Sequence, residues 1–316
     1  MTKPGAFLLK RLNLIKLAFI TLTGASLFLS CKSTPDLAPV DAFELLDGDA
    51  AMYLTIPVQN NQSFVSSAIQ KVARVAQNDA EKIAGRLDMA YVAVGSDGRV
   101  QLSCGGNIPT TFIGMALNEK NGWNAGAKDG QVFYTSSATG FELCIPSDSN
   151  VFLASDIGRM AKRYNKIAYS VYSEENLKKN KNADTILAYK NSSEKLLSEF
   201  LKEYDYKFLH ENISSNIMLY SPNPKFFLRN FLGAVDVRTT ISSIYGTVAP
   251  YNKVNGYDYT VTLVLNLSDS RTVKATEALL KVGLFGMASK ISQTGQSQIT
   301  IVDLLLTKNQ ILSLVR

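Results

Sequence analysis

Short runs of apolar residues predict β-strands along much of this chain, and amphipathic stretches between them predict helices. The most regular run lies over 257–267, where apolar and polar residues alternate, as in a strand with one buried and one solvated face. An Asp-Gly turn at 97–98 separates two shorter runs, 89–94 and 99–104, and predicts a hairpin because both turn positions need positive φ. Three- and four-residue spacing over 64–76 predicts a helix that lies on a sheet.

The remaining elements follow from the same patterns. Further strands are expected at 51–56, 131–135, 141–145, 150–154, 185–189, 216–220, 239–248, 299–305 and 310–315. Further helices are expected at 79–87, 109–118, 156–165, 192–203 and 271–287, with polar loops at 119–130 and 289–298. Strands in adjacent runs, with helices between the runs, predict an α+β protein in which helices cover one face of each antiparallel sheet.

A charged and polar stretch at 167–182 is the best boundary between two such units, 41–170 and 171–316. The first unit resembles a ferredoxin-like sandwich. Both halves share the order strand, helix, hairpin, helix, hairpin, which favours a possible duplication; an independent origin of the same order is the alternative. The corresponding parts would be 51–54 with 217–220 (or, less well, with 186–189), 89–104 with 239–267, and 131–145 with 299–315.

Residues 1–30 have the pattern of an export signal. Their cations are Lys3, Lys10, Arg11 and Lys16, and they include no acidic residue. The apolar run that begins at residue 17 is shorter than the roughly 20 apolar residues that a membrane-spanning helix needs. We therefore expect this segment to be a cleaved secretory signal peptide and not part of the folded protein.

Residues 27–30, Leu-Phe-Leu-Ser, lead directly into Cys31. A small residue before such a cysteine resembles the lipobox of bacterial lipoproteins, and Phe28, in place of the usual leucine, resembles the looser pattern of spirochaete and treponemal members. The resemblance implies that Cys31 is diacylated, starts the mature chain and anchors it in the cell envelope. Residues 31–40, polar with two prolines, would form a flexible tether. The alternative is a signal in which Cys31 is incidental.

Removal of the signal changes the charge of the chain. The 33 basic residues fall by the 4 in the signal to 29 and all 27 acidic residues remain, so the mature net charge is 29 − 27 = +2. A nucleic-acid-binding function thereby loses its main support. Lys178, Lys179 and Lys181 form one dense basic run among asparagines, which is typical of a solvated linker.

Two cysteines, Cys104 and Cys144, remain once Cys31 is acylated. An even pair in an exported protein can form a disulfide, provided that the α-carbons lie within about 7 Å of each other. The predicted strands that carry them are not neighbours, so two buried free thiols are the alternative that the topology favours.

The sequence lacks residues and motifs that several classes of catalytic and metal site require. A single histidine, His210, excludes a multi-histidine metal site within one chain, and we expect it to form a surface pair with Glu211. The nucleophile-elbow, phosphate-loop, dinucleotide and calcium-loop motifs are all missing. We therefore expect no enzymatic activity, no metal and no cofactor, with a hydrolase as the minor alternative.

Trp123, Phe226 and Phe227 are candidates for a contact surface. Trp123 is the one tryptophan and stands in a stretch rich in glycine and asparagine, so it either packs on the core as a lid or contacts a partner. The two phenylalanines could line a groove that faces lipid, although core packing is the commoner explanation of aromatic residues at helical spacing.

The sequence thus predicts a lipid-anchored envelope protein that faces the periplasm or the cell exterior and acts as a non-enzymatic binding or scaffolding module. Its expected partners are the membrane, through acylated Cys31, and an unknown envelope protein. The alternative function is a carrier that binds a small or apolar ligand between the two units.

Overall fold

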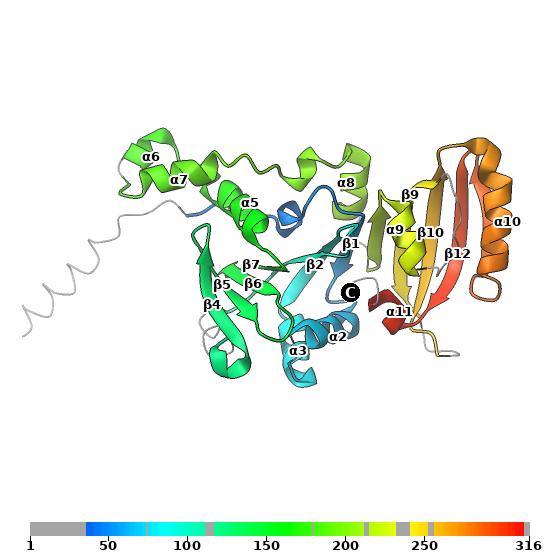
Figure 1. Ribbon diagram of the computed structural model, residues 1–316, viewed down its shortest axis with the longest axis horizontal. Coiled ribbons are helices and arrows are strands. Elements are labelled where there is room, and N and C mark those ends of the chain that lie inside the picture. The colour runs from blue at the N-terminus through cyan, green and yellow to red at the C-terminus, as the bar shows by residue number, and fades with distance from the viewer. Residues whose placement is uncertain are drawn as a thin grey trace, which may run out of the picture.

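The computed structural model describes residues 36–73, 75–110, 117–178, 180–211, 215–231, 241–251 and 256–312. Its strands are β1 (Met52–Pro57), β2 (Leu87–Val94), β3 (Val100–Gly106), β4 (Trp123–Lys128), β5 (Gln131–Ser136), β6 (Glu142–Ser147), β7 (Asn150–Ala154), β8 (Ile217–Ser221), β9 (Ile241–Pro250), β10 (Tyr259–Leu267), β11 (Lys290–Gly295) and β12 (Gln298–Leu306). They form one sheet in the order β11-β12-β10-β9-β8-β1-β2-β3-β7-β6-β5-β4, and every pairing in it is antiparallel (Figure 1).

Helices lie on both faces of this sheet. The α-helices are α2 (Gln62–Ala73), α3 (Gln77–Ala84), α5 (Gly158–Ala168), α6 (Glu174–Lys178), α7 (Ala183–Lys190), α8 (Glu203–His210), α9 (Pro224–Phe231), α10 (Val273–Gly283) and α11 (Lys308–Leu312). Short 3-10 turns are η1 (Ala42–Leu45), η3 (Glu119–Asn121), η4 (Tyr169–Val171), η5 (Leu197–Glu199) and η6 (Ser270–Thr272). None of the described helices combines the length and the apolar content that crossing a bilayer requires.

Strand β1 joins the two halves of the sheet. It pairs with β2 along one edge and with β8 along the other, where Leu54 lies opposite Leu219 and Tyr53 opposite Tyr220. Every residue of β1 is buried. A strand covered on both faces reads as a continuous apolar run, which is the pattern of residues 51–56.

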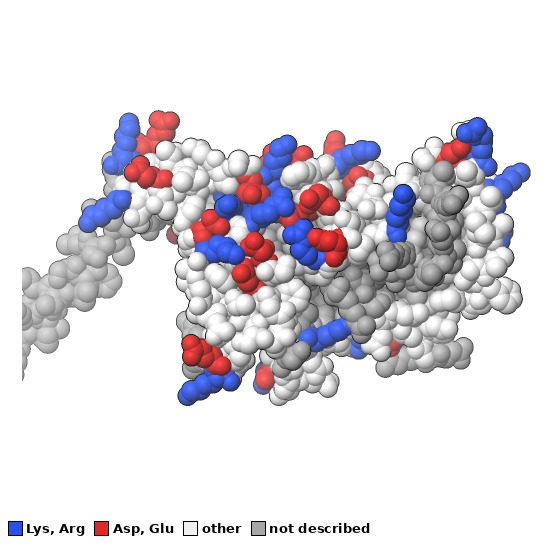
Figure 2. All heavy atoms as spheres, viewed as in Figure 1, with Lys and Arg blue, Asp and Glu red and all other residues white. Residues whose placement is uncertain are grey.

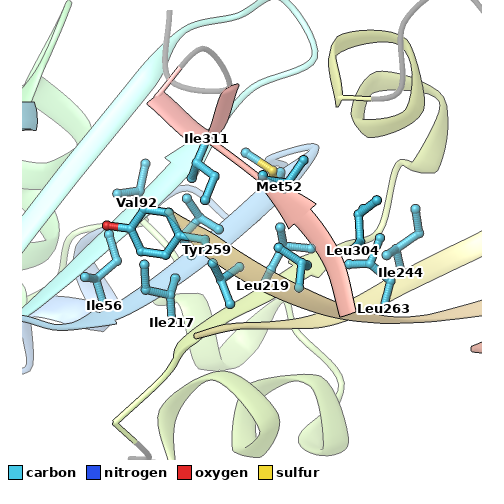
Figure 3. Close-up of a cluster of buried hydrophobic side chains, with 14 of the residues drawn as sticks. Met52, Ile56, Val92, Ile217, Leu219, Ile244, Tyr259, Leu263, Leu304 and Ile311 are labelled. Carbon is cyan, nitrogen blue, oxygen red and sulfur yellow. The ribbon is translucent and has the colours of Figure 1, made fainter. Parts of the chain in front are cut away.

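Because helices cover both faces of the sheet, a hydrophobic core lies on each face. On the first face, α2, α9, α10 and α11 pack on the sheet, and Figure 3 shows Leu219 and Ile217 of β8 beside Met52 and Ile56 of β1. On the second face, η1, α5 and α8 pack on the sheet over a separate set of buried side chains that includes Phe43. Each half of the chain contributes to both cores.

The expected α+β class is confirmed, but helices cover both faces of one sheet and not one face of two. Read outward from the β1–β8 pairing, the strand orders match: β1-β2-β3-β7-β6 on one side and β8-β9-β10-β12-β11 on the other. This local symmetry agrees with the expected match of 51–54 to 217–220 and of the two hairpins. The ferredoxin-like duplication itself stays a prediction, as does the division into units 41–170 and 171–316.

Several local predictions are wrong for physical reasons. The expected strand at 185–189 is helix α7, in which Ile186 is buried and Tyr189 contacts the ring of Tyr169. In place of the expected helix at 192–203, residues 192–196 have no regular secondary structure, 197–199 form η5 and α8 begins only at Glu203. The Lys195 carbonyl in this segment accepts a hydrogen bond from Arg163. The expected strand at 310–315 is helix α11 in its described part.

Other local predictions missed polar strands. The expected loops at 289–298 and 119–130 contain β11 and β4, which are the two edge strands of the sheet. Edge strands need few buried apolar residues, so their sequences resemble loops. Most of the helix expected at 109–118 lies outside the described residues.

The first described residues, 36–47, cross the second face of the sheet, and we call this segment the strap. Its bonds to the rest of the protein begin at Ala38, whose N–H donates to the Ala168 carbonyl over 2.9 Å. Asn150 donates to the Val40 carbonyl over 3.1 Å. The expected tether, 31–40, is therefore shorter than predicted, because Ala38 and Val40 are bonded to the folded protein.

Arg163 of α5 fastens the other end of the strap. Its side chain is fully buried, and its guanidinium donates to the Leu45 carbonyl over 3.0 Å and to Asp47 over 2.6 Å. It also donates to the Lys195 carbonyl over 2.8 Å and lies 3.4 Å from Glu194. A buried charge is tolerated when it is paired and hydrogen-bonded in this way.

We expect Leu54→Ala to destabilise the whole sheet, since Leu54 is 1% exposed at the joint between the halves. Truncation of a buried leucine costs roughly 2 to 5 kcal/mol. Urea denaturation followed by circular dichroism measures this loss. The control is Leu187→Ala, because Leu187 is 44% exposed on α7. Equal effects of the two changes would contradict a central role for β1.

Candidate functional site

Helix α10 packs on the outer strands of the sheet through one face. Val273, Thr276 and Leu280 of the helix are buried, and so is Leu284, which caps its C-terminus. Their three- and four-residue spacing is that of a single helix face. This face anchors α10 to the first core beside β11 and β12.

The opposite side of the same helix is also apolar at its C-terminal end. Leu279 is 50% exposed, Val282 is 79% exposed and Phe285, just beyond the helix, is 89% exposed. We call these three side chains the α10 tip. Their spacing of three places them along one side of the helix end. Single exposed apolar residues are ordinary, but three neighbours of this size mark a candidate contact surface.

Basic residues outnumber acidic ones along the segment 273–290 that carries the α10 tip, and the exposed Asp303 of β12 lies beside this segment, 3.0 Å from the Ser289 hydroxyl. Lys274, Lys281 and Lys290 are exposed, and Glu277 accepts from Lys281 over 2.6 Å along the helix. Among the described residues from 273 to 290, three cations thus stand against one anion. Figure 2 shows basic side chains at this end of the molecule. An apolar patch bordered by lysine is the composition of surfaces that bind anionic lipid.

The α10 tip and the strap lie far apart. The strap begins at the end of α5, where Ala38 meets Ala168, and α10 lies at the opposite end of the long axis of the molecule (Figure 1). Any surface that both of them touch must therefore extend along that axis.

The structure does not assemble the expected contact residues into one surface. Trp123 is buried, 5% exposed, at the start of β4, so the packing alternative holds and the contact alternative is wrong. Phe226 is partly buried against the first core, which again favours packing. The side chain of Phe227 lies outside the described residues, as does Cys31.

The structure shows two free thiols, the alternative that the predicted topology favoured, and not the possible disulfide. Cys104 and Cys144 are both free and buried, and they belong to the first and second cores respectively, on opposite faces of the sheet. Strand β7 lies between the strands that carry them, so their α-carbons are roughly 10 Å apart, beyond the reach of a bridge. Burial raises the pKa of each thiol to about 12, which removes the reactive thiolate at neutral pH.

His210 does not form the expected pair with Glu211. Its Nε2 lies 2.7 Å from Oδ2 of Asp41 in the strap. The structure shows no cluster of metal-ligating side chains among the residues it describes.

The sequence predicted a helix over 271–287, which includes Leu279 and Val282, but did not show that these two side chains face outward. The signal was present, because residues 279–288 contain one charged residue and are apolar on all sides of the helix. Such a segment has more apolar residues than one buried helix face can hold. Which side meets the sheet was decided by the tertiary structure.

Comparisons with known proteins give one family. The model of the outer membrane-associated lipoprotein TP0453, a family of the spirochaete Treponema, matches residues 37–312. Crystal forms I and III of TP0453 are each 18% identical to this chain, cover 88% of it and 97% and 98% of their own chains, and have TM-scores of 0.58 and 0.57. A search of curated proteins gave no match.

We expect the native protein to resist alkylation of Cys104 and Cys144 with iodoacetamide at pH 8, because both thiols are buried and protonated. After denaturation without reductant both should react. Mass spectrometry of tryptic peptides measures each site. A requirement for reductant before either cysteine reacts would show that a disulfide exists.

Proposed function

This chain belongs to the family of the outer membrane-associated lipoprotein TP0453, and we propose that it is a non-enzymatic, lipid-anchored binding module that contacts the membrane twice. The first contact is the acylated Cys31 that precedes the strap. The second is the α10 tip, whose exposed Val282 and Phe285 would enter the lipid surface. The exposure of these two side chains is the observation that carries the proposal.

The apolar side chains of the α10 tip set the free energy expected of this second contact. Burial of a valine or phenylalanine side chain is worth about 1.5 to 3 kcal/mol each. Two or three such side chains give a weak and reversible contact, which becomes effective when acyl chains already hold the protein at the membrane. The lysines beside the tip would add attraction to anionic lipid headgroups.

Two contacts at opposite ends of the long axis would orient the protein. With the strap end held by the anchor and the α10 tip in the lipid surface, the long axis would lie along the membrane (Figure 1). The sheet and its helices would then be presented at a fixed height above the membrane, where an envelope protein could dock. This geometry supports a scaffolding role.

The carrier alternative receives less support. It places a ligand in a gap between the two halves, but the halves meet through the β1–β8 pairing, where Tyr53, Leu54 and Leu219 are buried. A ligand there would have to displace paired strands. The joint therefore favours a binding or scaffolding module.

We expect the double change Val282→Ser and Phe285→Ser to weaken vesicle binding roughly tenfold or more, since it removes the apolar side chains that would enter the lipid. The changes are made in a chain that also carries Cys31→Ala, so that the acyl chains do not mask the effect. Flotation with vesicles that contain anionic lipid measures the binding.

Val132→Ser together with Leu187→Ser is the matched control, because these side chains are 56% and 44% exposed on β5 and α7, away from α10. Equal loss of binding in both variants would mean that general surface hydrophobicity, and not the α10 tip, holds the protein on vesicles. Unchanged binding in the α10 variant would remove the second contact from the proposal.

We expect Cys31→Ala alone to abolish fatty-acid labelling and to leave the fold unchanged, because residue 31 precedes all the described contacts. Metabolic labelling with a fatty acid and circular dichroism of the purified protein measure the two effects. Persistent labelling of the variant would show that the chain is acylated at a residue other than Cys31.

A further inference from the structure

The first residues of the strap are held to the folded protein by bonds of two kinds. Ala38 and Val40 make the two uncharged hydrogen bonds described above, at 2.9 and 3.1 Å. Asp41 makes a charged one, 2.7 Å from Nε2 of His210 at the end of α8. Of these three attachments, the bond between Asp41 and His210 is the one that includes an imidazole, a group that titrates near neutral pH.

The surroundings of His210 bring several charges and rings together. Its imidazole is stacked on Phe43 of η1 and on Tyr206 of α8, with ring centroids 5.4 and 5.1 Å apart. Asp41, Glu44 and Glu211 are the charged groups that act on it. The side chains of His210 and Asp41 are 30% and 37% exposed, so protons reach both.

These neighbours set the direction of the titration. The hydrogen bond to Asp41, opposed by partial burial, raises the pKa of His210 above 6.5. For Asp41 burial acts in the upward direction, but the hydrogen bond from His210 leaves its pKa below 3.8. The imidazolium–carboxylate attraction is therefore fully present below pH 6.5 and is lost as the pH rises through the raised pKa of His210.

Loss of this attraction would free only part of the strap. Residues 36–41 are exposed or half-buried, whereas 42–46 are buried. Phe43 and Leu45 are 0% exposed, and the guanidinium of Arg163 holds the Leu45 carbonyl and Asp47. Release is thus expected to stop at the start of η1.

We propose that the bond between His210 and Asp41 is a pH-dependent latch that sets how firmly residues 36–41 are held on the folded protein. With the latch closed, a charge-assisted bond adds to the hydrogen bonds of Ala38 and Val40. With the latch open, those two bonds hold residues 36–41 without it, so this part of the strap opens more often. The latch depends on the described contacts alone; its effect on the attachment to the membrane also rests on acylation of Cys31.

Two measurements on the mature lipidated chain in detergent micelles test the latch. Because the chain has one histidine, selective labelling gives one imidazole signal, and NMR titration should place its pKa above the ordinary value. Hydrogen exchange of residues 36–41, corrected for the intrinsic pH dependence, should become several-fold faster between pH 5.5 and 8.5. Exchange of residues 43–47 should stay constant over the same range.

Variants separate the latch from simple loss of structure. Asp41→Asn removes the charge and should return the imidazole to its ordinary pKa, with fast exchange of 36–41 at both pH values. Glu211→Gln is the matched control, because it removes a nearby charge that makes no bond to the strap, and it should keep the pH dependence. His210→Gln should give exchange that no longer depends on pH.

An ordinary pKa in the unmodified chain, or exchange of 36–41 that does not change with pH, would overturn the latch. A pKa that stays raised in Asp41→Asn would also overturn it. None of these outcomes depends on vesicle binding by the α10 tip, so the latch and the proposed membrane contact can fail separately.

Discussion

The pairing of β1 with β8 is the interaction on which the rest of the structure depends. It makes one sheet from strands contributed by both halves of the chain, and it places a strand with no exposed residue at the centre. Because a strand buried on both faces needs cover on both, the helices divide into two layers and the apolar residues into two cores. The outer strands and edges are arranged outward from that joint.

The strap and the α10 tip differ in the surroundings of their side chains. At one end the strap carries polar and charged side chains that are satisfied by specific partners, as Arg163 satisfies the Leu45 carbonyl and Asp47. At the other end the α10 tip leaves Val282 and Phe285 in water, which costs free energy in the isolated protein. In the proposed membrane contact, burial of these two side chains in lipid would recover that cost.

Two kinds of strand could be predicted from the sequence. A strand buried on one face shows alternating apolar and polar residues, and a strand buried on both faces shows a continuous apolar run. The alternation over 257–267 became β10, and the apolar run at 51–56 became β1. Edge strand β11 could not be predicted, because its residues pack on little and read as a loop. The segment 185–189 is helical, with Ile186 packed in a small cluster with Tyr172 and Leu177 and with Tyr189 on the ring of Tyr169, and a pattern over five residues does not contain these contacts.

The same limit applies to the candidate sites. Acylation of Cys31 could be predicted, because the signal and the lipobox-like sequence are adjacent in the chain; it stays a prediction. The pair of His210 and Asp41 joins positions 169 residues apart, so only the fold brings them together. The α10 tip lay between these cases, since its excess of apolar residues was visible but its outward side was not.

The position of the strap also determines how the protein would bear a mechanical load. In a chain anchored through Cys31, a pull would load the hydrogen bond of Ala38, pass along the strap and reach β1, in the middle of the sheet and not at an edge. On that path it meets Phe43, Leu45 and the guanidinium of Arg163, all fully buried. A force that extracts the strap would have to break these buried contacts. The strap therefore resists tension next to the central strand of the sheet.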